Sequence, residues 1–162
     1  MPTKIYWLHT FGNSAKIGIM ARPRGDNWLE DEINHLKNNK VGVLVSLLER
    51  GEINELKLDL EEELCIIKHI DYINYPIPDR DIPKYGDKTN QLIERLTRKL
   101  NEGLSVVIHC RMGIGRSSII AAAVLMTYKL KSNDIMNNIS NVRGIKVPDT
   151  DKQIAWLKAR ET

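Results

Sequence analysis

The sequence predicts an α/β protein with one mainly parallel central sheet, helices on both faces, and an antiparallel hairpin at its N-terminal edge. Apolar runs at residues 41–46 and 105–108 show the continuous hydrophobicity of strands that are buried on both faces. Segments of helical periodicity alternate with these runs, which is typical of a parallel sheet. With 162 residues, 42% of them hydrophobic, the chain can bury the core of one domain. We therefore expect residues 1–162 to form a single domain.

Five strands are predicted from short apolar and β-branched runs that are bounded by turn residues. In chain order they are residues 5–8, 17–20, 41–46, 70–75 and 105–108. The first two flank a turn around Gly12 and Asn13, so we expect them to pair as the hairpin. The third should lie near the centre of the sheet.

Helices are predicted where apolar residues recur every three to four positions. They lie at residues 28–38, 53–56, 60–69, 87–101, 116–130 and 132–142, with a last one through Trp156 and Leu157. Leu64 and Ile67 are expected to share a buried face. The helix after Arg116 is apolar nearly all round and should be the central buried helix. Polar residues that can cap helix N-termini are Asp26 or Asn27, Ser132, and Asp149 or Thr150.

Composition and charge exclude several classes of function. The net charge is +3, and basic and acidic residues are interspersed, so no basic stripe indicates a nucleic-acid partner. No apolar run reaches the length of a membrane span, and the N-terminus lacks the apolar stretch of a secretory signal. The four histidines show no metal-ligand spacing. We expect a cytoplasmic protein with no metal, other cofactor, nucleic acid or membrane partner, while its oligomeric state is not indicated.

One segment carries the chemistry: the chain passes from the strand at 105–108 through a glycine-containing loop into a helix. Residues 110–116, which we call the phosphate loop, begin with Cys110 and end with Arg116. Such a loop can point its backbone N–H groups inward around an oxyanion, and the helix dipole points its positive end there too. Arg116 adds a planar fork for two phosphate oxygens. The residues between them that would line the site are Arg111, Met112, Gly113, Ile114 and Gly115.

Cys110 is the predicted nucleophile. Only a thiolate attacks, and the loop N–H groups, the helix dipole and Arg116 all favour the thiolate over the thiol. Attack on phosphorus would form a cysteinyl-phosphate, whose equatorial oxygens Arg116 would stabilise. Ser117 could donate its hydroxyl to the sulfur and make it a better leaving group. His109 is expected to orient the loop through hydrogen bonds.

A phosphoester also needs an acid that protonates its leaving oxygen. Asp79 is the predicted general acid, because it lies in the proline-rich loop 76–83 that follows the neighbouring strand. Asp81, two residues further on, could share or take over this role. Gln153, at the start of the last helix, could position the water for hydrolysis.

These residues resemble the cysteine-based protein tyrosine phosphatases, in particular the compact dual-specificity type that includes the cyclin-dependent-kinase-associated phosphatase and its small microbial relatives. The positions that match the family's phosphate-loop motif are His109, Cys110, Gly113, Gly115, Arg116 and Ser117. Asp79, 31 residues before Cys110, is similar in place to the family's general acid, and Gln153 matches its late glutamine. The resemblance implies a phosphatase fold that hydrolyses phosphotyrosine, and also phosphoserine or phosphothreonine, in a phosphorylated protein or peptide.

Several alternatives stay open beside this reading. Met112 and Ile114 stand where inositol-phospholipid phosphatases have lysines, which disfavours a phosphoinositide, although Arg111 leaves one cation nearby. A nucleotide or an RNA 5′-triphosphate could use the same loop, and a non-catalytic module could bind phosphate without hydrolysing it. Rhodaneses and arsenate reductases also use a loop thiol, but they give Asp79 and Ser117 no role.

Three residues outside the motif have open roles. Cys65 lies in a helical stretch without an anion-binding loop, so we expect it to fill the core. A redox role with Cys110 would require the two Cα atoms to lie within about 7 Å. Arg22 and Arg24 lie in a segment without a clear counterpart in the family and could contact an anionic substrate.

Overall fold

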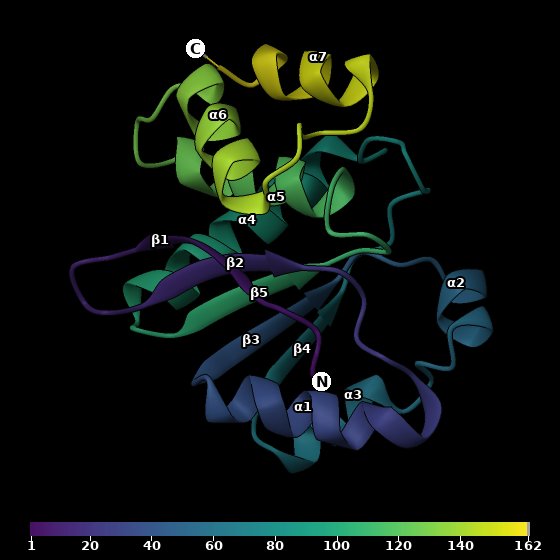
Figure 1. Ribbon diagram of the computed structural model, residues 1–162. Helices are drawn as coiled ribbons and strands as arrows, with labels where there is room; N and C mark the ends of the chain where they lie inside the picture. The colour runs from purple at the N-terminus through teal and green to yellow at the C-terminus, as the bar shows by residue number, and fades with distance from the viewer. Residues whose placement is uncertain (162) are drawn as a thin grey trace.

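The computed structural model describes residues 1–161, which form five strands and seven α-helices (Figure 1). The strands are β1 (Tyr6–Thr10), β2 (Lys16–Met20), β3 (Val41–Ser46), β4 (Asp71–Asn74) and β5 (Ser105–His109). The helices are α1 (Leu29–Asn38), α2 (Arg50–Glu55), α3 (Glu61–Ile67), α4 (Gly86–Asn101), α5 (Arg116–Met126), α6 (Ser132–Arg143) and α7 (Asp151–Ala159). A short 3₁₀ helix, η1 (Asp26–Trp28), precedes α1.

All five strands form one sheet in the order β1-β2-β5-β3-β4. β1 and β2 pair antiparallel, and the other three pairings are parallel, so the predicted α/β architecture with an N-terminal edge hairpin is confirmed. β5 lies at the centre, where His109 at its carboxyl end pairs with Met20 of β2 and Ser46 of β3. In parallel sheets ligands bind at this edge, and the phosphate loop begins here.

Helices cover both faces of the sheet (Figure 1). α4, α5, α6 and α7 lie on one face, and α1 and α3 lie on the other. Successive side chains of β5 alternate between the two cores: Val106 and Ile108 pack with the first group, and Val107 packs with the second. The central strand is therefore buried on both sides, as its continuous apolar sequence predicts.

Two of the predicted helix caps are wrong. Asp26 has a φ of 55° and lies in η1, and the N-cap of α1 is Trp28, which makes no side-chain cap. The hydroxyl and the backbone N–H of Ser132 both donate to the Glu161 carboxylate, so Ser132 opens α6 without capping it. Thr150 does cap α7, because its side chain accepts a hydrogen bond from the backbone N–H of Gln153.

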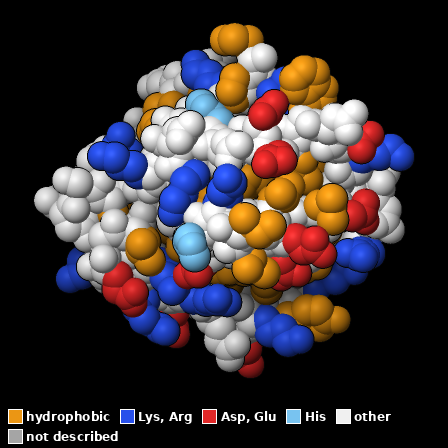
Figure 2. Space-filling view, turned by 90° about the horizontal axis from the view of Figure 1, so that it is seen from below, with side chains coloured by type: hydrophobic (Ala, Val, Ile, Leu, Met, Phe, Trp, Pro, Cys, Tyr) orange, Lys and Arg blue, Asp and Glu red, His pale blue; other side chains and the backbone are white. Residues whose placement is uncertain are grey.

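The buried face of α3 also differs from the expected one. Ile67 is 65% exposed and Leu64 only partly buried, whereas Glu61 and Cys65 are buried. Glu61 turns inward because buried polar partners bind it, and Cys65 follows one helical turn later. Figure 2 shows the surface of the molecule on the side of α1 and α3, where charges of both signs surround patches of hydrophobic side chains. Exposed hydrophobic residues in and beside α3 are Leu60, Ile66 and Ile67.

The helices of residues 1–161 are all too short or too polar to traverse a lipid bilayer.

Candidate active site

The phosphate loop leaves β5 between the ends of its two neighbouring strands. The backbone N–H of Leu47, just after β3, donates to the carbonyl of His109, and that of Arg22, just after β2, donates to the carbonyl of Arg111. Cys110 is 3% and Arg116 2% exposed, so both catalytic candidates are anchored in the core.

Two glycines let the loop fit its surroundings. Gly113 has a φ of 69°, and a methyl group on its Cα would lie 2.6 Å from the carbonyl carbon of Met20. A methyl group on Gly115 would lie 2.6 Å from Oδ2 of Asp149. A side chain at either position would collide with neighbouring atoms, and at Gly113 it would also strain the backbone.

Arg143, at the end of α6, binds the outer side of the loop. Its Nε donates to the carbonyl of Gly113 over 2.9 Å, and its Nη2 donates to that of Met112 over 3.3 Å. The Tyr6 ring stacks on the same guanidinium, with its centroid 4.2 Å from Cζ. A loop that turns its N–H groups inward exposes carbonyl oxygens outward, and Arg143 provides their counter-charge. A lone arginine at a helix end gave no sequence signal for this role.

The structure brings Cys110 and Ser117 together, as the motif predicts. Sγ of Cys110 lies 3.3 Å from Oγ of Ser117, and both side chains are buried. Ser117 belongs to the first turn of α5, so its hydroxyl is held against the sulfur by the same helix whose N-terminus faces the loop.

Arg116, the first residue of α5, donates hydrogen bonds to several oxygen acceptors. The Glu52 carboxylate accepts from Nη1 over 2.7 Å and from Nη2 over 2.9 Å. Nη1 also donates to the carbonyl of Ile77 over 2.9 Å, and Nη2 to Oδ1 of Asp79 over 3.0 Å. Among residues 1–161, no acceptor binds Nε, which leaves this donor for a ligand.

Glu52 was not identified from the sequence, although it is the main partner of Arg116. Burial opposes its ionisation, but hydrogen bonds from Arg116 and from the backbone N–H of Glu49 outweigh this, so its pKa is lowered. Burial likewise disfavours the Arg116 charge, but Glu52, Cys110 and Asp79 favour it and raise the pKa of Arg116. The capping box formed with Glu49 could have predicted the start of α2, but not this pairing.

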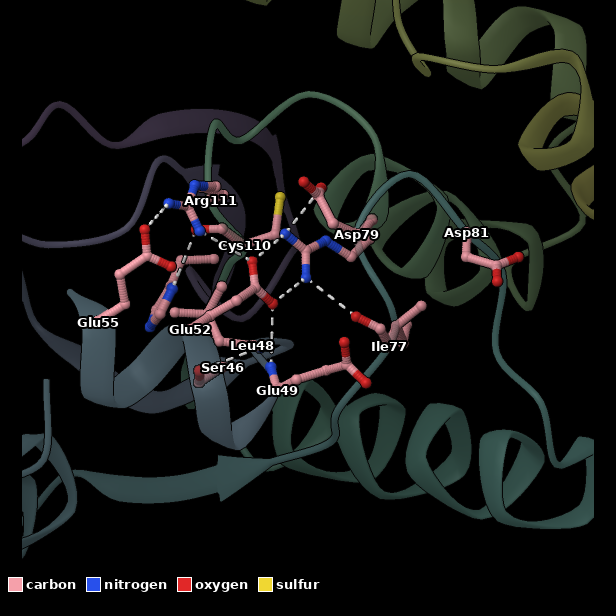
Figure 3. Close-up of polar contacts among 12 residues, drawn as sticks. Ser46, Leu48, Glu49, Glu52, Glu55, Ile77, Asp79, Asp81, Cys110 and Arg111 are labelled. Atoms are coloured by element: carbon pink, nitrogen blue, oxygen red, sulfur yellow. Dashed lines mark hydrogen bonds and ion pairs between the residues drawn. The ribbon is translucent and has the colours of Figure 1, made fainter.

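The two candidate acids point in different directions (Figure 3). Asp79 lies beside Arg116 and Cys110, with its side chain about half exposed. Asp81 points away from them and pairs with Nζ of Lys152 over 2.7 Å, and this contact lowers the pKa of Asp81. Of the two carboxylates, only Asp79 therefore reaches the phosphate loop.

Gln153 is fully buried, and both ends of its amide are engaged. Its Oε1 accepts from the backbone N–H groups of Asp149 and Thr150, and its Nε2 donates to the carbonyl of Asp81 over 3.1 Å. The same side chain lies against Gly115. Gln153 therefore links the loop that carries the candidate acids to the phosphate loop and to α7.

His109 joins a buried polar network next to Cys110. Its Nε2 lies 2.8 Å from Oε2 of Glu61, and its Nδ1 lies 3.4 Å from the Cys110 carbonyl oxygen. Tyr72 donates its hydroxyl to the other oxygen of Glu61, and burial together with Glu61 raises the pKa of Tyr72. This network ties the end of β5 to α3 and β4.

The other three arginines that the sequence singles out are engaged by neighbouring protein groups. Arg24 pairs with the buried Glu32, and Nη1 of Arg22 donates to the carbonyl of Pro23. Arg111 lies at the loop but pairs with Glu52 and Glu55 on α2. Within residues 1–161, no group of three or more His, Cys, Asp or Glu side chains is placed to hold a metal ion.

Cys65 packs into the core on the opposite face of the sheet from Cys110. Both cysteines are free. Burial, together with Glu61 and Glu62, raises the pKa of the Cys65 thiol to about 12. Cys65 is therefore a core residue and a poor nucleophile.

The chain is similar to known phosphatases and to a kinase inhibitor. Residues 18–129 match the family model described as "Polymorphic toxin system, DSP-PTPase phosphatase". A curated relative, cyclin-dependent kinase inhibitor 3 of Rattus norvegicus, is 27% identical over 170 residues, which cover 96% of this chain and 77% of the relative.

Several solved structures share the fold. Kinase associated phosphatase, with its catalytic cysteine replaced by serine, has a TM-score of 0.86 at 22% identity and covers 97% of this chain and 93% of its own. PTPMT1 in complex with PI(5)P has a TM-score of 0.75 at 16% identity, and the match covers 96% of this chain and 94% of PTPMT1. The chain therefore belongs to the DSP-PTPase phosphatase family of polymorphic toxin systems and is a compact dual-specificity cysteine phosphatase.

Proposed function

We propose that the protein hydrolyses phosphotyrosine, and also phosphoserine or phosphothreonine, in phosphorylated proteins through a cysteinyl-phosphate on Cys110. One observation carries this proposal: a thiol, a guanidinium and a carboxyl group converge at the carboxyl edge of the sheet. Sγ of Cys110 contacts Ser117, and Arg116, the last residue of the same loop, contacts Asp79 over 3.0 Å. These are the nucleophile, the anion clamp and the acid that phosphoester cleavage requires.

The first step forms a bond between Sγ of Cys110 and phosphorus and breaks the bond to the leaving oxygen, which takes a proton from Asp79. In the second step water attacks phosphorus and gives its proton to Asp79, and the sulfur leaves as a thiolate. Ser117 stabilises this thiolate through its hydroxyl. Arg116 and the loop N–H groups hold the phosphoryl oxygens throughout.

Phosphate entry would also prepare Asp79 for its role. A phosphate that binds Nε and Nη2 of Arg116 competes with Asp79 and Glu52 for Nη2, while Glu52 and the Ile77 carbonyl still hold Nη1. Asp79 is then released from Arg116 and can approach the leaving oxygen of the bound phosphoester.

A phosphoprotein is supported over a lipid by the residues around the loop. Met112 and Ile114 supply no charge for additional phosphates, and Arg111 is committed to Glu52 and Glu55. The names of the relatives, cyclin-dependent kinase inhibitor 3 and kinase associated phosphatase, also connect such proteins with kinases. A phosphoinositide is the second candidate, because PTPMT1, crystallised with PI(5)P, shares the fold.

The substrate class is tested by comparing initial rates on equal concentrations of different phosphoesters. The panel contains phosphotyrosine, phosphothreonine and phosphoserine peptides, a phosphatidylinositol monophosphate in vesicles, a nucleotide and an RNA 5′-triphosphate. We expect the highest kcat/KM for phosphotyrosine peptides. A higher kcat/KM for the lipid or for RNA would overturn the assignment, and phosphopeptide binding without any phosphate release would identify a non-catalytic module.

The role of Asp79 predicts a dependence on the leaving group. In Asp79→Asn, hydrolysis of a phosphoserine peptide, whose alkoxide leaves poorly, should fall by about 10²- to 10⁴-fold. Hydrolysis of p-nitrophenyl phosphate, whose leaving group needs little protonation, should fall much less. The matched control is Asp81→Asn, which removes only an exposed pair with Lys152 and should change both rates by roughly twofold or less. Equal losses on both substrates in Asp79→Asn would contradict the acid role.

A further inference from the structure

A cleft of about 230 Å³ opens beside the phosphate loop, between the loop and the segment that joins α6 to α7. Its apolar walls are formed by Ile114, Ile145, Pro148 and Ile154. Lys146, Asp149, Thr150 and Asp151 line its polar side. Ile145 is 47% exposed, so an aliphatic side chain is presented to solvent at the rim of the site.

The cleft is fixed to the phosphate loop at both of its walls. On one wall, Arg143 donates to the carbonyls of Met112 and Gly113, which positions Ile145 two residues later in the chain. On the other wall, Asp149 packs against Gly115. Ile114, which lies between these two anchors, contributes both to the loop and to the cleft.

A second cavity lies next to this cleft, between α6 and α7. It has a volume of about 330 Å³ and shares Lys146, Pro148 and Ile154 with the first. Asn133 and Asn137 of α6 also line it, and their amides could bond a peptide backbone. The two cavities are therefore neighbours.

We propose that this cleft binds an aliphatic side chain of the substrate polypeptide, close to the phosphorylated residue. This inference rests on the proposed function. An extended peptide advances by at most about 3.5 Å per residue. When the phosphoryl group is held in the loop, a residue one to three positions before or after the phosphorylated one therefore reaches the cleft. Its aliphatic wall, formed by Ile114, Ile145, Pro148 and Ile154, matches Leu, Ile or Val.

The preference is measured with phosphotyrosine peptides built on an alanine background. A single Leu or Glu is moved through the three positions on each side of the phosphotyrosine. At one position Leu should raise kcat/KM by roughly tenfold over Ala, which corresponds to burial of much of one aliphatic side chain. Glu at that position should give no gain.

The cleft is tested by the Leu-to-Ala ratio of kcat/KM in variants, because this ratio cancels general effects on catalysis. Ile145→Ser should reduce the ratio to about threefold or less, and Ile145→Leu should restore it. The control is Ile66→Ser, since Ile66 is 63% exposed on α3, on the other face of the sheet. Its ratio should stay at the wild-type value.

Three results would overturn the proposal: no Leu preference at any position, a preference that Ile145→Ser leaves unchanged, or a dimer that Ile145→Ser dissociates. Failure of the proposed function is separate, because it would appear as no release of phosphate from any peptide. In that event, binding of the same peptides to Cys110→Ser, followed by fluorescence polarisation, still reports whether the cleft selects Leu.

Discussion

Cys110→Ser is expected to reduce kcat on p-nitrophenyl phosphate and on phosphotyrosine peptides by on the order of 10⁴-fold or more. A serine hydroxyl is not ionised near neutral pH, so neither the loop nor Arg116 can supply the missing nucleophile. The fold should persist, because the new hydroxyl replaces a 3% exposed thiol and can hydrogen-bond to Ser117. Initial rates and a urea melt of the same preparation separate the two effects.

Cys65 provides the matched control within the same chain. Cys65→Ala should retain the wild-type kcat, since Cys65 lies in the opposite core and does not contact the phosphate loop. Iodoacetate should inactivate the wild type by alkylating Cys110, while the Cys65 thiol, with a pKa of about 12, stays unmodified in the folded protein. Persistent activity in Cys110→Ser would contradict the assignment. A loss of activity that depends on alkylation of Cys65 would also contradict it.

Glu52→Ala is expected to have the second largest effect, on both stability and activity. It removes two hydrogen bonds from a guanidinium that is 2% exposed, which leaves a buried charge with only the Ile77 carbonyl and Asp79. Breaking one side of such a pair costs about 3 kcal/mol of the free energy of unfolding. kcat/KM should fall as well, because one oxygen at each Nη atom holds the guanidinium less firmly in the geometry that clamps phosphate.

The pH dependence of stability distinguishes this ion pair from simple packing. The folded-state pKa of Glu52 lies below its ordinary value of 4.5. Its ionisation therefore stabilises the fold fully above that value, and this contribution is lost as the pH falls through the lowered pKa. The difference in unfolding free energy between wild type and Glu52→Gln should therefore shrink on acidification from about pH 6 to about pH 3.

Glu55→Gln is the control for this prediction. Glu55 lies on the same helix, but its side chain is 65% exposed and its ion pair is with Arg111. Exposed pairs contribute little to stability, so this variant should behave like the wild type. An equal effect of the two glutamine substitutions, or a Glu52→Gln difference that is independent of pH, would contradict the role of Glu52.

The features that could be predicted from the sequence are those with a local signal. The apolar runs of β3 and β5, the turn of the hairpin and the periodicity of α4 indicate the sheet and its layers correctly. The phosphate loop is also local, because Cys110, Arg116 and Ser117 lie within eight consecutive residues. Chain geometry alone then places them around one anion site.

The supporting residues could not be predicted because their partners are distant in the sequence. Glu52 lies 64 residues before Arg116, Glu61 lies 48 residues before His109, and Arg143 lies 30 residues after Gly113. An isolated glutamate or arginine on a helix usually points to solvent, and only the tertiary fold shows otherwise. The prediction for the buried face of α3 is wrong for a related reason. Tyr72 and His109, which are distant in the sequence, bind Glu61 and so decide which face of the helix turns inward.

The central claim, that the phosphoryl group passes through the Cys110 sulfur, is tested most directly by trapping the intermediate. Wild type and Ser117→Ala are mixed with radiolabelled phosphotyrosine peptide, quenched in acid within one turnover, and mapped by proteolysis and mass spectrometry. The account predicts a phosphoryl group on Cys110, with more label in Ser117→Ala because the sulfur leaves less readily. Release of phosphate with no label on the protein, or with label on another residue, would contradict it.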